Sequence, residues 1–279
     1  VIVENRRAAR DGEMVIALLD GDRDRRDAGG DLRSIVVTLP RSETVSGPIE
    51  PVDVELYYHA GDPRPVVLVL PEDMLTVATA APVLPRVEPA LAWPAPGALR
   101  DVRRLLLAAE RPFVIVGGSG WTPESAQALQ RFAENWTLPV GCGFRFQDTF
   151  DNRHPLYAGD VGIGINPALA QRVREADLVL AVGVRLGEMT TGGYTLLQAP
   201  RPMQRLIHMH AGAEELGRVY AADLMLQASM ACAGKALETL AAPPAAPWRA
   251  WAEGAQADYR ANLVAPAVEP MDLAVVVKT

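Results

Sequence analysis

The stretch that decides the fold is Pro112-Phe-Val-Ile-Val-Gly-Gly-Ser-Gly120, and a second stretch matches it, Leu178-Val-Leu-Ala-Val-Gly-Val-Arg-Leu-Gly187. Each is a short run of consecutive apolar residues that ends in glycine. Runs without alternation are typical of strands covered on both faces, as in a parallel sheet with helices on either side. Glycine at the carboxyl end of such a strand lets the backbone approach a ligand closely. The two stretches therefore predict an α/β domain of the nucleotide-binding type.

The residues around these stretches alternate between helical and strand-like segments. We expect helices at Ala98–Glu110, from Thr122 and Pro123 onward, at Pro167–Glu175 and at Ser229–Leu240. We expect strands at Phe113–Gly117, Pro139–Cys142, Leu178–Gly183, Leu206–His210 and Leu224–Ala228. Thr122 and Asn166 are residue types that cap helix N-termini, and each is followed by a proline suited to the first helical position. This alternation predicts a doubly wound parallel sheet over residues 99–240.

The flanking segments have a different character. Residues 1–75 contain three strand-like runs, at 14–19, 34–39 and 66–70, with few helical stretches, which indicates a partial N-terminal α/β segment. Residues 76–98 are rich in Ala and Pro and are interpreted as a linker. A second Ala/Pro-rich linker is expected from 241, and a helix-like segment begins at Met271, so residues 241–279 are interpreted as a linker and the start of a further domain. The chain is interpreted as part of a larger protein.

Composition excludes several classes of function. The chain has 279 residues, 49% hydrophobic and 22% charged, with a formal net charge of −7. An acidic chain of this kind does not attract nucleic acid electrostatically. No apolar run approaches the roughly 18 residues that span a bilayer, so no membrane association is expected. The two cysteines, Cys142 and Cys232, fit neither a metal motif nor a disulfide framework, which favours a reducing cytoplasm.

Several motifs resemble one known family. Arg64-Pro-Val-Val-Leu-Val-Leu-Pro-Glu-Asp-Met74 resembles the last strand of the pyrimidine-binding domain of thiamine-diphosphate enzymes of the acetolactate synthase type. Residues 99–240 resemble that family's central domain, through motifs such as His154-Pro-Leu-Tyr-Ala-Gly159, Ala176-Asp-Leu-Val-Leu-Ala-Val-Gly-Val-Arg-Leu186 and Glu215-Leu-Gly217. The resemblance covers roughly residues 64–279 and implies a Rossmann-like central domain.

The resemblance also implies an activity. The parent reaction is decarboxylation of a 2-keto acid such as pyruvate, followed by transfer of the acyl-equivalent carbanion, in a homodimer or homotetramer. Thiamine diphosphate is activated by a glutamate of the first domain, and its Mg²⁺ is held by a Gly-Asp-Gly…Asn motif of the third. Glu4 and Asp20-Gly21-Asp22 do not reproduce these motifs in context. No catalytic or metal residue is therefore assigned, and the chain alone is expected to be inactive.

The candidate cofactor-binding residues lie at the two glycine-rich strand ends. They are Gly117, Gly118, Ser119, Gly120, Gly183, Arg185, Thr190 and Thr191. The first turn either cradles a diphosphate at the start of the following helix or is a tight turn that requires glycine. Arg185 either pairs with a phosphate or closes its own loop by pairing with Glu188. The resemblance implies FAD or ADP at these turns in some family members.

Flavin is possible but disfavoured, because His210 and Gly212 stand where FAD-binding relatives carry acidic residues. His208 and His210 share one face of an expected strand, so a metal pair is conceivable, although zinc sites normally use three or four protein ligands. The stretches Phe144–Asp148 and Tyr157–Pro167 follow an expected strand and face either the neighbouring domains or substrate, and packing against neighbouring domains is the favoured interpretation. Cys142 is interpreted as a small core residue.

Two other functions stay open. The chain is either a non-catalytic module that binds FAD or ADP, or a structural spacer between its neighbours. An NAD-dependent dehydrogenase domain is the weaker alternative. Gly117-Gly-Ser-Gly-Trp121 is not the expected G-x-G-x-x-G fingerprint, and no acidic residue ends the following strand.

Overall fold

The computed structural model describes residues 13–17, 34–38 and 90–264. Strands β1 (Glu13–Ala17) and β2 (Ser34–Thr38) pair antiparallel and agree with two of the three strands expected in the N-terminal segment. The third expected strand, at 66–70, lies outside the described residues, as do Glu4, Asp20–Asp22 and the helix-like segment from Met271. Residues 90–264 belong to a second compact unit, and the following paragraphs concern that unit alone.

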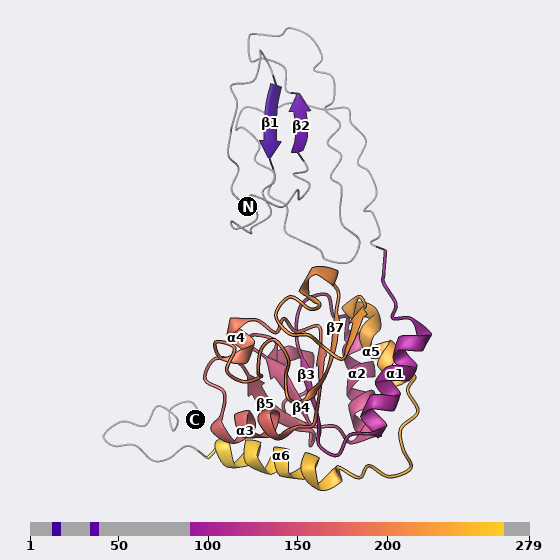
Figure 1. Cartoon of the computed structure of the whole chain (residues 1–279), viewed down its shortest axis with the longest axis vertical. Helices are drawn as coiled ribbons and strands as arrows, with labels where there is room; N and C mark the ends of the chain where they lie inside the picture. Colours follow the sequence, from indigo (N-terminus) through magenta and orange to yellow (C-terminus); the bar gives the residue numbers. More distant parts are fainter. Residues whose placement is uncertain (1–12, 18–33, 39–89, 265–279) are drawn as a thin grey trace, which may run out of the picture. The chain divides into compact units, whose positions relative to one another are not determined.

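A six-stranded, wholly parallel sheet forms the centre of the unit (Figure 1). Its strands are β3 (Pro112–Val116), β4 (Val140–Gly143), β5 (Tyr157–Val161), β6 (Leu178–Val182), β7 (Arg205–His210) and β8 (Leu224–Gln227). Their order is β5-β4-β3-β6-β7-β8, so the chain winds outward from β3 in one direction and from β6 in the other. This is the strand order of the doubly wound dinucleotide-binding folds, and it confirms the expected fold class.

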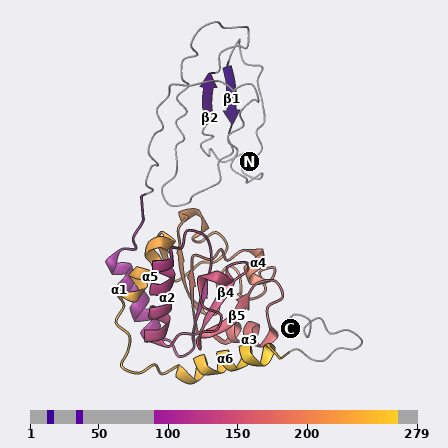
Figure 2. The same ribbon diagram turned by 180° about the vertical axis from the view of Figure 1, so that it is seen from behind.

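Helices cover both faces of the sheet because its strands are apolar on both faces. Helices α1 (Pro96–Leu107), α2 (Pro123–Trp136) and α5 (Met230–Glu238) contribute to the core on one face, and α3 (Pro167–Glu175) contributes to the core on the other. Val114 and Val116 of β3 belong to the first core, whereas Phe113 and Ile115 belong to the second. Figure 2 shows α1, α2 and α5 grouped together. None of the helices within residues 90–264 is long and apolar enough to cross a membrane.

The expected helix caps are confirmed. The Thr122 hydroxyl accepts a hydrogen bond from the Ser125 N–H at 3.2 Å, at the start of α2. The Asn166 side chain accepts from Ala168 N–H at 2.7 Å, at the start of α3. These bonds satisfy N–H groups that have no partner within the helix. Both helices therefore begin where the local sequence predicts.

Two boundaries differ from the sequence-based expectations. Helix α1 begins at Pro96, so the linker expected over 76–98 overlaps its first turn. Tyr157–Val161 is the edge strand β5, although we interpreted this stretch as a loop. Gly159, which has a φ of +119°, and the exposed Asp160 interrupt the apolar run that normally indicates a buried strand. An edge strand needs only one strand neighbour and tolerates such residues.

The structure also corrects the linker expected from residue 241. Helix α6 spans Arg249–Asn262 and packs against the domain. The Trp248 ring is 1% exposed, stacks on Trp136 with 6.3 Å between ring centroids, and donates a hydrogen bond to the Trp136 carbonyl at 2.9 Å. Ala and Pro are abundant from 241 to 247, but the apolar residues further along are spaced for one helix face. The Ala/Pro-rich composition therefore did not reveal α6, because the contact that anchors it, between Trp248 and Trp136, joins residues far apart in the sequence.

We expect Trp248→Ala to lower the free energy of unfolding by about 3–5 kcal/mol, because it removes a fully buried aromatic side chain. Trp93→Ala is the matched control, since Trp93 is 57% exposed, and it should change stability by less than about 0.5 kcal/mol. Urea unfolding followed by circular dichroism measures both. Equal effects of the two substitutions would restore the interpretation of a linker.

Candidate functional site

The two glycine-rich strand ends lie side by side at the centre of the sheet. Strands β3 and β6 are neighbours, with Val116 paired to Val182. The Gly117 N–H donates to the Val182 carbonyl at 3.1 Å, so the pairing extends one residue beyond β3. Between these strands the chain changes its winding direction, and open α/β sheets bind ligands at this position, beyond the carboxyl ends of the strands. The sequence-predicted residues therefore gather at the expected edge.

Glycine is required at this edge because the two turns lie against each other. Gly118 and Gly183 have φ values of +78° and +73°. A Cβ atom on Gly118 would overlap the Gly183 carbonyl oxygen, and one on Gly183 would overlap the Gly117 carbonyl oxygen. The tight-turn explanation therefore accounts for Gly118 and Gly183 without a ligand.

The first turn is also held by side chains. The Trp121 indole N–H donates to the Gly117 carbonyl at 2.8 Å. A Cβ on Gly117 would lie 3.2 Å from the Phe146 ring, which therefore packs on this turn. Ser119 and Gly120 are exposed. These two residues are the part of the first turn that a ligand can reach.

Arg185, at the second strand end, pairs with a residue that the sequence did not suggest. Its guanidinium lies 2.9 Å from a carboxylate oxygen of Glu215, which follows β7 in a short 3-10 helix, η3 (Ala213–Glu215). The expected alternative, an Arg185–Glu188 pair, is not the pairing found. The side chain of Arg185 is 64% exposed and that of Glu215 is 13% exposed. The pair ties the second strand end to the end of β7 and leaves much of the guanidinium open to solvent.

The two threonines contribute to the structure of the second turn. They lie in the short helix α4 (Glu188–Thr191), and both are buried. The Thr191 hydroxyl donates to the Gly187 carbonyl at 2.9 Å and accepts from the Tyr194 N–H at 3.1 Å. These bonds hold Tyr194 in a left-handed conformation, with a φ of +63°. Thr191 is therefore committed to the turn itself.

Both histidines make hydrogen bonds to nearby backbone. His208 Nε2 lies 3.1 Å from the Val184 carbonyl oxygen, so it is the donor in that bond. His210 Nδ1 accepts from the Gly212 N–H at 3.0 Å. Burial lowers the pKa of His208 to about 4, so this ring is neutral at physiological pH. Within residues 90–264 no group of three or more His, Cys, Asp or Glu side chains could hold a metal ion.

A neighbouring surface joins the two stretches expected to follow a strand, Phe144–Asp148 and Tyr157–Pro167, to helix α4, which the sequence did not connect with them. A Cβ on Gly162, after β5, would lie 2.8 Å from Phe144 Cβ and 3.2 Å from the Met189 carbonyl oxygen, so the ends of β4 and β5 meet α4. Ile163 and Met189 are exposed large apolar residues on these segments. Their only signal in the sequence is an apolar residue within a glycine-rich segment.

Cys142 lies in the core, as expected. Burial raises the pKa of its thiol to about 12, so the reactive thiolate is negligible at neutral pH. The side chain therefore acts as a small apolar residue beneath the candidate site rather than as a nucleophile.

Comparison with known proteins identifies relatives of this domain. The family model described as thiamine pyrophosphate enzyme, central domain, matches residues 99–240. Acetolactate synthase isozyme 2 large subunit of Escherichia coli (strain K12) is 27% identical over 172 residues, which are 61% of this chain and 31% of that protein. Sulfoacetaldehyde acetyltransferase of Roseovarius nubinhibens is 31% identical over 121 residues, 43% of this chain and 20% of that protein.

A third relative has another activity in its name. 3D-(3,5/4)-trihydroxycyclohexane-1,2-dione hydrolase of Geobacillus thermodenitrificans is 30% identical over 101 residues, 36% of this chain and 16% of that protein. The chain thus aligns with less than a third of the length of each of these three relatives. The matched region is shared by enzymes that are named for different reactions.

We expect Gly118→Ala to destabilise the protein by about 2–4 kcal/mol, because the methyl group adds a backbone overlap to the cost of a left-handed residue. Gly164→Ala is the matched control, since Gly164 has a φ of +74° but a methyl group there would meet no atom within 4 Å. It should cost about 1–2 kcal/mol, the conformational term alone. Urea unfolding compares the two, and equal losses would contradict the close packing of the turns.

Proposed function

Because this chain belongs to the family of thiamine pyrophosphate enzymes, of which it contains the central domain, we propose that it is part of an acetolactate synthase-like enzyme. Such an enzyme decarboxylates a 2-keto acid and transfers the resulting acyl-equivalent carbanion to a second carbonyl. The observation that carries this proposal is the match over residues 99–240, supported by the longest of the three reported alignments, which is to an acetolactate synthase large subunit. The identity of the acceptor substrate is left open by relatives named for three different reactions.

The described residues do not supply the chemistry of this reaction. Mg²⁺ prefers carboxylate and carbonyl oxygens beside phosphate, and residues 90–264 hold no cluster of acidic side chains that fits this need. Glu4 and Asp20–Asp22, the acidic residues that were compared with the family's cofactor-binding motifs, lie outside the described residues. No catalytic step through thiamine diphosphate or Mg²⁺ is therefore assigned to residues 90–264. The proposal is that the central domain supports neighbouring domains that carry the cofactor.

The remaining parts of the proposal concern the whole enzyme. We propose a homodimer or homotetramer that acts on a small 2-keto acid such as pyruvate, with thiamine diphosphate and Mg²⁺ as cofactors, in the cytoplasm. Support comes from membership of the family and, for the reducing compartment, from the burial of both cysteines as free thiols.

An activity assay tests whether the chain alone is inactive. We expect the 279-residue chain, supplied with pyruvate, thiamine diphosphate and Mg²⁺, to form no acetolactate and release no CO₂. The expectation follows from the described part of the chain, where no group of three or more His, Cys, Asp or Glu side chains could hold Mg²⁺. An acetolactate synthase large subunit in the same assay is the positive control. Turnover by the chain alone would refute the proposed inactivity of this piece.

A second candidate function is nucleotide binding at the two strand ends. It is favoured by the position of Arg185, whose guanidinium is largely exposed at the point where the strand order reverses. Exposed Ser119 and Gly120 would then face the diphosphate, and Arg185 would pair with it. The other candidate residues would shape the turns rather than touch the ligand: Gly117, Gly118, Gly183, Thr190 and Thr191. FAD stays disfavoured, because His210 and Gly212 bond to each other and offer no carboxylate.

Calorimetric titration with ADP tests this candidate. If Arg185 meets the phosphates, Arg185→Met should weaken ADP binding about tenfold or more, the usual range for a charge-assisted hydrogen bond. Arg174→Met is the matched control, because Arg174 is an exposed arginine on α3, away from the strand ends. An absorbance scan near 450 nm of the purified protein tests for flavin. Absence of ADP binding, or equal binding by both variants, would rule out the assigned role of Arg185.

A further inference from the structure

Helix α6 runs beside the sheet from its amino edge to its carboxyl edge. Near its start, the Trp251 indole N–H donates to the carbonyl of Pro112, the first residue of β3, at 3.0 Å. At its end, Asn262 contacts Asn166, the N-cap of α3, which follows the carboxyl end of β5. Fourteen helical residues span about 21 Å. The helix therefore returns the chain from the edge where α5 ends to the edge that carries the candidate site.

The helix closes the side of the sheet at β5. Trp248 belongs to the core on one face and Ala255 to the core on the other, while Trp251 packs against both. The rings of Tyr259 and Tyr157 of β5 meet edge to face, with 4.9 Å between centroids. Among residues 90–264, no backbone hydrogen bond joins α6 to β5. The edge is thus covered by side chains, which can separate without breaking a sheet ladder.

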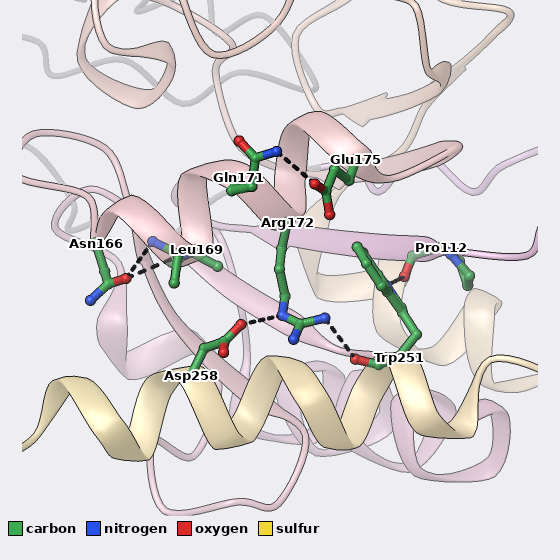
Figure 3. Close-up of polar contacts among 9 residues, drawn as sticks. Pro112, Asn166, Leu169, Gln171, Arg172, Glu175, Trp251 and Asp258 are labelled. Carbon is green, nitrogen blue, oxygen red and sulfur yellow. Dashed lines mark hydrogen bonds and ion pairs between the residues drawn. The ribbon is translucent and has the colours of Figure 1, made fainter.

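Arg172 of α3 makes the most polar contacts that any one described side chain makes with this helix. Figure 3 shows Arg172 reaching down from α3 between Asp258 and Trp251 of α6. Its Nε bonds to the Asp258 carboxylate, its Nη1 donates to the Trp251 carbonyl at 3.4 Å, and its guanidinium lies 4.9 Å from the centroid of the Trp251 ring. The side chain of Arg172 is 19% exposed, so solvent screens these contacts less than at an open surface.

The sequence of α6 is adapted to this arginine. A Cβ on Gly254 would lie 2.6 Å from Arg172 Nη2, so the glycine provides the space in which the guanidinium lies. Trp251, Gly254 and Asp258 are spaced by three and four residues and therefore share one helix face. Glycine in mid-helix is unfavourable relative to alanine, and here it coincides with a specific contact.

Without docking, α6 is a weak helix. Its N-cap, Trp248, makes no side-chain capping bond, and its first turn contains no acidic residue. Isolated helices of about this length are marginal in water even with favourable sequences. Its stability therefore depends on the tertiary contacts just described.

We propose that α6 is a latched strap: a unit that closes the β5 side of the domain, opens as a whole and is held by Arg172. While the latch is closed, the strap holds the end of α6, at Asn262, at the carboxyl edge of the sheet. When it opens, that end is released and the ring of Tyr157 is uncovered. This device is independent of the function proposed for the strand ends.

Hydrogen exchange with mass spectrometry on the 279-residue chain tests the latch. In Arg172→Met, we expect amides of 249–262 to exchange about tenfold faster or more, with one common rate increase, while peptides of β3 and β6 keep their protection. Arg174→Met is the matched control, with the same charge change on the same helix, and should leave α6 unchanged. Unchanged exchange of α6 in Arg172→Met, or equal acceleration in both variants, would overturn the proposal.

A second variant keeps the test decisive if Arg172→Met fails to fold. Gly254→Ala leaves every polar group in place and puts a methyl group where Nη2 lies. A helix with no such latch would be protected better by alanine, whereas a latched strap should exchange faster or gain nothing. Slower exchange of α6 in Gly254→Ala would overturn the proposal.

A distance measurement tests the release of the end of α6. Spin labels on Val264→Cys and Asn135→Cys, both exposed, avoid the two buried natural cysteines. We expect one narrow distance distribution in the otherwise natural protein and with Arg174→Met. Arg172→Met should add a broad population. A distribution that stays narrow in Arg172→Met would contradict the role of the latch in fixing the end of α6.

Discussion

The structure depends on one constraint: a parallel sheet that is apolar on both faces must be covered on both faces. Val114 and Val116 of β3 face one core and Phe113 and Ile115 face the other, so neither side of the central strand can remain in water. Helices α1, α2 and α5 meet this requirement on one face and α3 on the other. On the first face, α2 and α5 pack closely against each other, since a Cβ on Gly234 of α5 would overlap the backbone of Ser125 in α2. With both faces covered, the carboxyl edge of the sheet is where loops can serve a ligand or a neighbouring domain.

The same close packing restricts what that edge can do. The turns after β3 and β6 contact each other through backbone atoms, and the Gly117 carbonyl already accepts a hydrogen bond from the Trp121 indole N–H. Glycine at these positions is thus explained by packing, and it is no evidence for a ligand by itself. Arg185 is the informative residue, because its guanidinium is held by Glu215 on one side and is open on the other. A site of this form would take a small anionic group at its rim rather than a ligand buried between the strands.

Much of the fold could be read from local sequence. Consecutive apolar runs predicted β3 and β6, and Thr122-Pro and Asn166-Pro predicted the starts of α2 and α3, because capping depends on neighbours within one turn. Strand β5 was missed because an edge strand accepts Asp160 and a glycine of positive φ. Helix α6 was missed because alanine and proline dominate the residues before it, while its anchors, Trp136 and Arg172, lie far away in the chain. The pairing of Arg185 with Glu215 instead of Glu188 was missed for the same reason, because Glu215 lies far from Arg185 in the chain.

By itself, the sequence determined the fold class, the family and the identity of the residues at the central strand ends. These properties follow from local patterns. Apolar runs, turn glycines and helix caps each depend on residues within a few positions of one another, so they can be recognised without knowing the tertiary structure. The tertiary structure alone decided where the domain closes and which groups at its edge are engaged. Residues 241–262 belong to the domain because Trp248 bonds to Trp136 and Asp258 bonds to Arg172. Thr191 and His208 have structural roles because their side chains are hydrogen-bonded to backbone groups. Side-chain partners are chosen by proximity in space, and proximity between distant segments exists only after the sheet and its helices have assembled.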